Sequence, residues 1–249
     1  MRQATCILFV MVCCLSASRA QTGGIQGTVT SVTPNPGGPP VAGGPVPGAR
    51  VFYRRSPVYA PARAGSAPQL APGEVPFDTS VLADANGNHA ASGLPAGDYV
   101  VCAAAPSQPF LDPCRWSRSP VVHVQSGAIS NLDVLLERGV FLNVRINDPQ
   151  GLLPTSAKTL FDPPHLIVGV VFGNGAFLAS SGVSTDGGGQ NYQIAVPTGV
   201  PLYLWLFSRH VSLADAQGKA FPLAGAAISF NAASGVDQSF TINVTGKLQ

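Results

Sequence analysis

Apolar and polar side chains alternate with a period of two along several stretches of the chain. Residues 140–147 show the pattern most clearly: the apolar set is Val140, Leu142, Val144 and Ile146, and the polar set is Asn143, Arg145 and Asn147. Successive side chains of a strand point to opposite faces of the sheet, so this alternation predicts a half-buried β-strand. After residue 20, helical spacing of apolar residues is always interrupted by Gly or Pro. The pattern therefore predicts an all-β protein.

Other stretches extend this prediction. Residues 166–172 and 200–207 are apolar at nearly every position, which is typical of central strands covered on both faces. Further strands are expected at 25–32, 49–53, 98–104, 120–124 and 129–136. Residues 33–48 are rich in Pro and Gly and are expected to form a loop, because proline cannot donate to a central ladder. Residues 56–80 are expected to form a second, longer loop.

Residues 84–104 combine two turns and two strands in one segment. The sequence DANG at 84–87 favours a tight turn, since Asp and Asn side chains bond to nearby backbone and Gly adopts a positive φ. LPAG at 94–97 turns the chain again before the apolar strand at 98–104. This alternation of short strands and turns is typical of a β-sandwich.

The segment recurs about one hundred residues later. Asp84, Gly87, Pro95 and Gly97 correspond to Asp186, Gly189, Pro197 and Gly199. A second pair of segments, 126–136 and 234–244, aligns in the same order, and its inward-facing residues are Leu132, Val134 and Leu136 against Phe240, Ile242 and Val244. We therefore predict two tandem antiparallel sandwiches, at 21–136 and 137–249. The joint at 137–139 is too short to be a flexible linker.

The first twenty residues are predicted to be a secretory signal peptide. Arg2 precedes an apolar core at 7–15, and SRA at 18–20 ends in a small-x-small pattern. The apolar run is shorter than the ~20 residues of a membrane span, although an uncleaved anchor helix is the alternative. Cleavage would bring the formal charge from +2 to zero, which leaves no electrostatic footprint for nucleic acid. We expect a secreted or periplasmic protein without a membrane span after cleavage.

Two cysteines, Cys102 and Cys114, remain after the signal peptide. An even pair in an exported protein predicts a disulfide, which contributes about 3 kcal/mol in the chain-entropy model. Two unpaired thiols are the alternative. Trp116, next to this pair, is expected to pack against the disulfide.

Four motifs occur in a recognisable order: GIQGTV at 24–29, PVPGARV at 45–51, DANG at 84–87 and GLPAGDYV at 93–100. In this order they resemble the carboxypeptidase regulatory-like domain family over about residues 24–136. The resemblance implies a prealbumin-like (transthyretin-like), Ig-like β-sandwich, grouped with carbohydrate-binding-like folds. In metallocarboxypeptidases this domain is an accessory beside a separate zinc-bearing domain. The matching residues are turn formers and core positions, so no ligand-binding residue is implied.

The motifs of the common hydrolases are absent from the sequence. None of His89, His123, His165 or His210 has a Glu three residues later, as a zinc peptidase motif requires. No Gly-x-Ser-x-Gly elbow occurs, and a Ca²⁺ loop starting at Asp84 has Pro95 where its last acidic ligand belongs. We therefore expect no catalysis, no metal and no cofactor, and no dense cluster of polar groups converging in a pocket.

The aromatic residues Tyr203, Trp205 and Phe207 alternate on one predicted strand. An exposed face would offer a platform for stacking on sugars, and a covered face would belong to the core, which is the commoner place for aromatic residues. The sequence favours a secreted, non-catalytic binding or display module whose partner is a glycan or an envelope protein. An accessory module of an envelope enzyme or receptor complex is the second hypothesis, and a cryptic hydrolase is a remote third.

Overall fold

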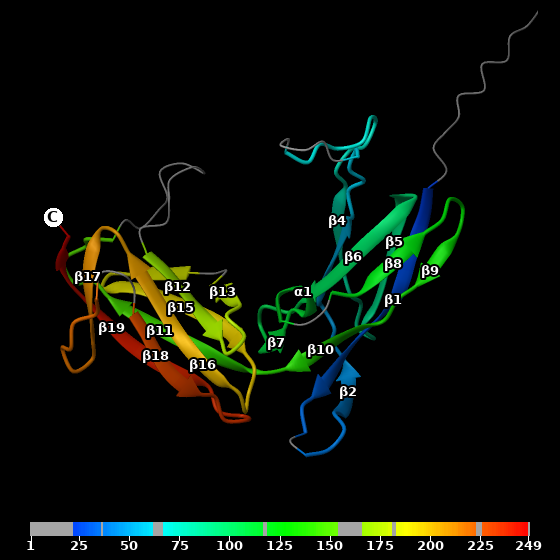
Figure 1. The fold of residues 1–249 in the computed structure, drawn as a ribbon. Coiled ribbons are helices and arrows are strands. Elements are labelled where there is room, and N and C mark those ends of the chain that lie inside the picture. The colour runs from blue at the N-terminus through cyan, green and yellow to red at the C-terminus, as the bar shows by residue number, and fades with distance from the viewer. Residues whose placement is uncertain are drawn as a thin grey trace, which may run out of the picture.

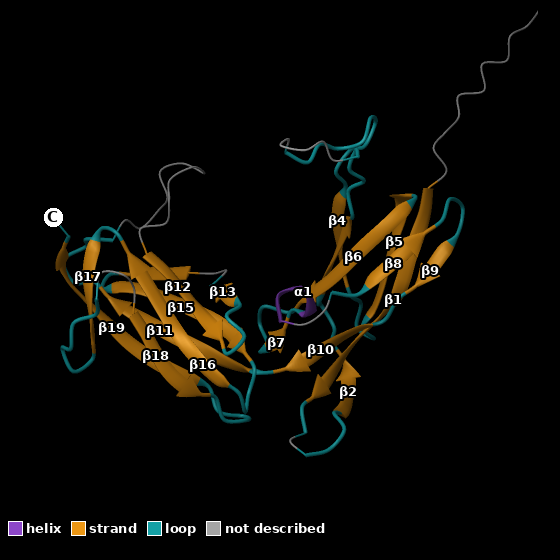
Figure 2. Cartoon of the chain, viewed as in Figure 1, coloured by secondary structure: helices purple, strands orange, loops and turns teal. Residues whose placement is uncertain are grey.

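The computed structural model describes residues 22–35, 37–61, 67–116, 119–153, 166–180, 183–222 and 226–248. Within them the chain is built almost wholly of strands, arranged as two β-sandwiches in tandem (Figures 1 and 2). The predicted signal peptide, His165 and part of the predicted loop at 56–80 lie outside the described residues. No helix of the described part is long and apolar enough to cross a membrane.

In the described residues of the first sandwich there are ten strands and one short helix. In chain order its elements are β1 (Thr22–Thr33), β2 (Val41–Pro45), β3 (Arg50–Arg55), β4 (Asp78–Leu82), β5 (Asn88–Pro95), β6 (Gly97–Ala104), β7 (Phe110–Leu111), α1 (Pro113–Trp116), β8 (Val121–Val124), β9 (Ile129–Asn131) and β10 (Val134–Arg138). One sheet has the order β4-β3-β6-β8. The other has the order β2-β1-β10-β7, with β5 and β9 also pairing with the long strand β1.

The part of the second sandwich that the structure describes contains nine strands. They are β11 (Val140–Asn147), β12 (Leu166–Phe172), β13 (Phe177–Ala179), β14 (Val183–Asp186), β15 (Gly189–Val196), β16 (Pro201–Ser208), β17 (Val211–Asp215), β18 (Ala226–Asn231) and β19 (Gln238–Lys247). Its two sheets have the orders β14-β15-β11-β19-β17 and β13-β12-β16-β18.

The two sandwiches repeat one strand plan. The order β4-β3-β6-β8 of the first recurs as β13-β12-β16-β18 of the second, and β1 lies between β5 and β10 as β11 lies between β15 and β19. The aligned residues Leu136 and Val244 are both buried. The repeat predicted from the sequence therefore has a counterpart in the order of the strands.

Each sandwich encloses its own apolar core. The alternating residues of β11 are buried as predicted, and Leu204 of β16 is fully buried among them. Val101 of β6 and Tyr53 of β3 are fully buried in a separate cluster within the first sandwich. Two distinct clusters are what a tandem arrangement requires, because a merged core would make one domain.

The structure corrects three details of the predicted strands. The predicted loop at 33–48 contains β2, an exposed edge strand where Pro45 is tolerated. The predicted strand at 129–136 is divided into β9 and β10, because the exposed carboxylate of Asp133 accepts bonds from the main-chain nitrogen and hydroxyl of Thr28 (both 2.8 Å). Pairing is mostly antiparallel, but β1 with β9 and β10, and β11 with β19, are parallel.

The joint between the sandwiches is a single residue, Gly139, between β10 and β11. Its main-chain nitrogen donates to the carbonyl oxygen of Pro109 (2.7 Å). A Cβ at this position would collide with the carbonyl oxygen of Val196 and press on the side chain of Leu111, so only glycine fits. Strand β10 continues past residue 136, where the sequence predicts that the first domain ends. The exact boundary between the domains stays a prediction.

Candidate functional site

A cavity of about 650 Å³ lies between the two sandwiches and is lined by both. One wall comes from the first sandwich, where residues 104–116 run from the end of β6 through β7 to α1. The other wall comes from the second sandwich, chiefly from the outer face of β11, β15 and β19 and from β13. We call this cavity the inter-sandwich cleft. Its volume is within the usual range of ligand pockets.

The wall formed by the second sandwich is a ladder of planar polar side chains. Because β11 buries its apolar residues, Asn143 and Arg145 point outward, and the strand register sets them opposite Gln193 and Asn191 of β15. Gln193 Nε2 donates to Asn143 Oδ1 (2.9 Å), and Arg145 Nη1 donates to Asn191 Oδ1 (3.1 Å). The hydroxyl residues Ser239 and Thr241 of β19 extend the same wall, where both are exposed.

The charge of Arg145 is balanced within this wall. Its two terminal nitrogens donate to the two carboxylate oxygens of Asp186, with Nη2 at 2.8 Å from Oδ1. These bonds hold the pKa of the Asp186 carboxyl well below its ordinary value, and the same pairing raises the pKa of Arg145. Arg145 therefore stays charged but paired, and the ladder presents hydrogen-bonding groups with little net charge.

The opposite wall carries aromatic and ionisable groups from α1. The ring of Trp116 packs on the ring of Phe172 of the second sandwich, with centroids 4.8 Å apart. Arg115 Nη2 donates to the carbonyl oxygen of Ala179 (2.7 Å). Burial raises the pKa of Asp112, although its carboxylate accepts a bond from the nitrogen of Cys114 (2.9 Å). The ring partner of Trp116 thus lies in the other sandwich, and packing of Trp116 against the disulfide stays a prediction.

The cleft also contradicts the expectation that no polar groups converge in a pocket. The sequence identified Asn143 and Arg145 as outward-facing, but it did not show that this face meets the first sandwich. The lining contains no His or Cys among the described residues. Tyr192 donates its hydroxyl to Gln190 Oε1 (2.7 Å), and burial raises its pKa to about 12, so it is a poor general base at neutral pH.

The aromatic residues singled out in the sequence lie on a different surface. Tyr203, Trp205 and Phe207 point away from the core on the outer face of β16, and Tyr203 is 38% exposed. Trp205 and Phe207 stack with centroids 5.6 Å apart and planes within 10°. Phe177 meets Trp205 edge to face at 5.4 Å, and the Arg209 guanidinium lies over Phe207. We call Phe177, Tyr203, Trp205 and Phe207 the aromatic row. Within it, the ring faces of Trp205 and Phe207 are turned to one another.

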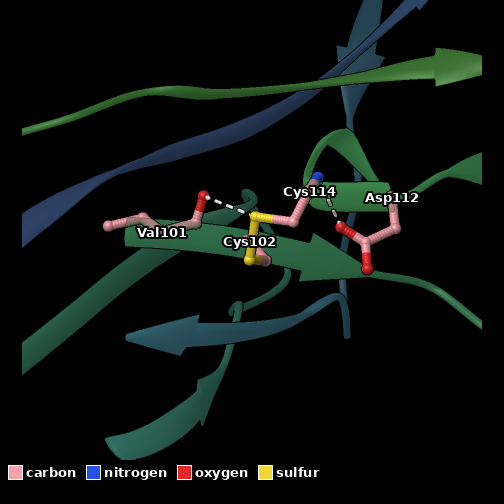
Figure 3. The surroundings of a disulfide bond; sticks show 4 residues. All are labelled: Val101, Cys102, Asp112 and Cys114. Carbon is pink, nitrogen blue, oxygen red and sulfur yellow. Dashed lines mark hydrogen bonds between the residues drawn. A yellow bond between two sulfur atoms is a disulfide. The ribbon is translucent and has the colours of Figure 1, made fainter. Parts of the chain in front are cut away.

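The predicted disulfide between Cys102 and Cys114 is confirmed, with a Cα–Cα distance of 5.5 Å (Figure 3). Asp112 lies beside it, and donor atoms of the three residues are within 4.8 Å of one another. Because both sulfurs are bonded to each other, they are not available as metal ligands in this state. At Asp84 the carboxylate accepts bonds from Asn86 and Asn88, which is the turn that the sequence predicts.

The fold defines this chain as a tandem β-sandwich protein. No family model and no curated protein matches its sequence, so the carboxypeptidase regulatory-like resemblance stays a prediction. Among solved structures, the Bacillus anthracis TIE protein is 12% identical with a TM-score of 0.31, and the match covers 91% of this chain but 34% of that one.

Two pilins also resemble the fold. A streptococcal ancillary pilin is 11% identical with a TM-score of 0.34, covering 92% of this chain and 64% of that one. The shaft pilin SpaA from Lactobacillus rhamnosus GG, as a double mutant, is 9% identical with a TM-score of 0.30, and the match covers 92% of this chain and 100% of that one. The chain thus spans about one to two thirds of the first two proteins. With scores this low, function has to be argued from the residues of this chain.

Proposed function

We propose that this chain is an exported, non-catalytic binding protein that holds a neutral carbohydrate in the inter-sandwich cleft. The observation that carries the proposal is the polar ladder of Asn143, Arg145, Asn191 and Gln193 facing the wall that bears Trp116. Amide groups both donate and accept, and a guanidinium donates through a pair of N–H groups, which suits vicinal hydroxyl groups that can donate and accept. An aromatic wall offers an apolar surface to the C–H face of a sugar ring.

The charge balance supports a neutral ligand. Arg145 is held by Asp186, and Arg115 is turned toward a main-chain oxygen of the other sandwich. An acidic ligand would have to compete with Asp186 for the Arg145 guanidinium. A peptide strand would gain its affinity from main-chain bonds at a sheet edge, whereas the cleft presents a sheet face whose ladder bonds are already made.

The proposal includes the finer expectations drawn from the sequence. These are export through the signal peptide at 1–20, the domain boundaries at 21–136 and 137–249, and membership of the carboxypeptidase regulatory-like family. Binding is favoured over hydrolysis because glycoside hydrolysis uses a pair of carboxyl groups, and Asp112 is the single acidic residue among the described residues of the lining.

A second candidate function rests on the aromatic row. Phe177 is 45% exposed and Tyr203 is 38% exposed on one sheet face, which favours contact with another protein of the envelope. In that case the chain is an accessory module of an enzyme or receptor complex. The ring faces of the row stack on one another, so it suits an apolar partner better than a sugar.

The test is titration calorimetry of the full mature chain with cellohexaose, mannohexaose and chitohexaose, with an acidic galacturonate hexamer as the comparison. We expect one or more neutral hexamers to bind and the galacturonate to bind at least tenfold more weakly. Removing both amides, with Asn143→Ala and Gln193→Ala, should weaken binding about thirtyfold, since two lost bonds of about 1 kcal/mol each amount to about 2 kcal/mol.

The chain offers a matched control. Gln26 Nε2 donates to Asn131 Oδ1 (2.9 Å) across two strands of the first sandwich, outside the cleft lining. The double variant Gln26→Ala, Asn131→Ala removes the same chemistry and should leave affinity unchanged. Failure of all three neutral hexamers to bind, or equal losses in both double variants, would refute the cleft as a carbohydrate site.

A further inference from the structure

The Cys102–Cys114 disulfide joins a sheet of the first sandwich to the residues that contact the second. Cys102 is on β6 between Val101 and Ala103, which are both fully buried in the first core. Cys114 is on α1, twelve residues later. Figure 3 shows the bridge between the strand and the helix, with Asp112 beside it. The bridge therefore anchors α1 to a strand whose alternate residues are buried in the first core.

Helix α1 has little stability of its own. It contains four residues, Pro113–Trp116, whereas isolated helices need about 12–15 residues to be even marginally stable in water. Its local bonds come from Asp112, whose main-chain oxygen accepts from Arg115 and Trp116 (both 3.0 Å). The disulfide is the covalent constraint that keeps this turn on β6.

The residues next to Cys114 make the contacts across the cleft. Arg115 donates to the carbonyl oxygen of Ala179, and Trp116 packs on Phe172 and reaches the apolar core of the second sandwich. The two sandwiches also meet at the joint at Gly139 and where β7 approaches β15. Without the disulfide, Arg115 and Trp116 would still be present, but α1 would no longer be held in the position from which they contact the second sandwich.

We infer that the disulfide is a redox-sensitive brace: its reduction releases α1 from β6, frees Trp116 from Phe172 and widens the inter-sandwich cleft. The step needs a dithiol, which transfers two electrons and two protons; the Cys102–Cys114 bond breaks to give two thiols, and the dithiol becomes a disulfide. Both cysteines are half-buried, so a small reductant can reach the bond. The effect on ligand binding, but not the release of α1, rests on the proposed function.

The chain permits a direct readout of Trp116. It has two tryptophans, so Trp205→Phe leaves Trp116 as the only one. In this variant, complete reduction by dithiothreitol should shift the fluorescence emission of Trp116 to longer wavelength and increase its quenching by iodide. Small-angle X-ray scattering of the wild-type chain should show a larger radius of gyration on reduction. Two thiols per mature chain, which lacks the three cysteines of residues 1–20, establish in a thiol assay that reduction is complete.

Circular dichroism and thermal melting separate release of the brace from unfolding. We expect the sheet signal and a cooperative melt to persist after reduction. Unchanged emission and scattering in the fully reduced chain would overturn the inference, and so would loss of the cooperative melt, because the disulfide would then stabilise the sandwich as a whole. The double variant Cys102→Ser, Cys114→Ser should match the reduced wild type; if it does not fold, the reduced chain still decides.

Titration with the neutral hexamers distinguishes the two proposals. Weaker binding by the reduced chain, by about tenfold, supports regulation of the cleft by the brace. Equal affinity in both states, with Trp116 released, would overturn the regulatory part alone. If no hexamer binds the oxidised chain while reduction still releases Trp116, the proposed function fails and the brace stands.

Discussion

The hydroxyl oxygen of Tyr53 lies 2.6 Å from Nδ1 of His89 inside the first sandwich, where both side chains are buried. Nε2 of His89 lies 3.1 Å from the carbonyl oxygen of Leu132. The imidazole is therefore fully bonded when neutral, with Nε2–H donating to Leu132 and Nδ1 accepting from Tyr53. Burial lowers the pKa of His89 below its ordinary value of 6.5, although the nearby carboxylate of Asp133 opposes the shift.

Acid should destabilise the first sandwich through His89. Its pKa is lower in the folded than in the unfolded chain, so between the two values the unfolded chain binds more protons. The stabilising contribution is complete above pH 6.5 and is lost as the pH falls through the unfolded value toward the folded one. Urea unfolding between pH 4 and 8 measures this directly.

The variant His89→Gln is the control for this pH dependence. It should be less stable than the wild type at pH 8 but lose stability less steeply between pH 6.5 and 5. The pKa of Asp112 is raised in the folded chain, so acid stabilises the folded chain through this group. Because both proteins contain Asp112, the difference between their pH profiles isolates the contribution of His89. Parallel pH profiles of the two proteins would contradict the assignment.

Each core should fail independently of the other. Val101 and Leu204 are both fully buried, in separate clusters. An aspartate at either position leaves an unpaired buried carboxylate that costs several kcal/mol, which approaches the whole stability of a domain. Limited proteolysis should digest the first sandwich of Val101→Asp and the second of Leu204→Asp, leaving the other protected. Loss of both sandwiches in each variant would indicate one cooperative unit.

Asp186→Asn should change the charge preference of the cleft. Asparagine can still accept the turn bond from the Gly188 nitrogen (3.0 Å in the native chain), but it no longer neutralises Arg145. The freed guanidinium should bind carboxylates, so affinity for the galacturonate hexamer should rise about tenfold while the neutral hexamers change little. No gain for the acidic hexamer would contradict the role given to this ion pair.

The aromatic row should matter for stability more than for carbohydrate binding. Trp205 stacks on Phe207 and meets Phe177, and each aromatic pair is worth about 0.5–1.5 kcal/mol. Trp205→Ala should therefore destabilise the second sandwich by about 1–3 kcal/mol in urea unfolding. Tyr203→Ala, which removes the exposed ring beside the stack, should change neither stability nor affinity for the hexamers appreciably.

The sequence predicts the strands and the duplication because both depend on local patterns. Alternation in β11, the turn at Asp84 and its counterpart at Asp186 each follow from neighbouring residues, and the structure contains all three. The split between β9 and β10 was missed because it depends on Thr28, more than one hundred residues away from Asp133. The even pair of cysteines that remains after the predicted signal peptide sufficed for the disulfide.

The inter-sandwich cleft could not be predicted in this way. It depends on where α1 places Trp116 and Arg115 relative to Phe172 and Ala179, and these contacts join residues 56 to 64 positions apart in sequence. Local alternation shows that Asn143 faces outward, but not what faces it. A pattern of outward amides on adjacent predicted strands is the one signal that would have pointed to the ladder.

The most direct test of the account is the nuclear magnetic resonance spectrum of the side-chain amide groups during titration with the neutral hexamers. Binding in the cleft predicts concentration-dependent shifts of the amide protons of Asn143, Asn191 and Gln193 and of the indole proton of Trp116. The amide protons of Gln26 and the indole proton of Trp205 should not move. Shifts confined to Trp205 and its neighbours on β16, with the cleft amides unchanged, would contradict the account.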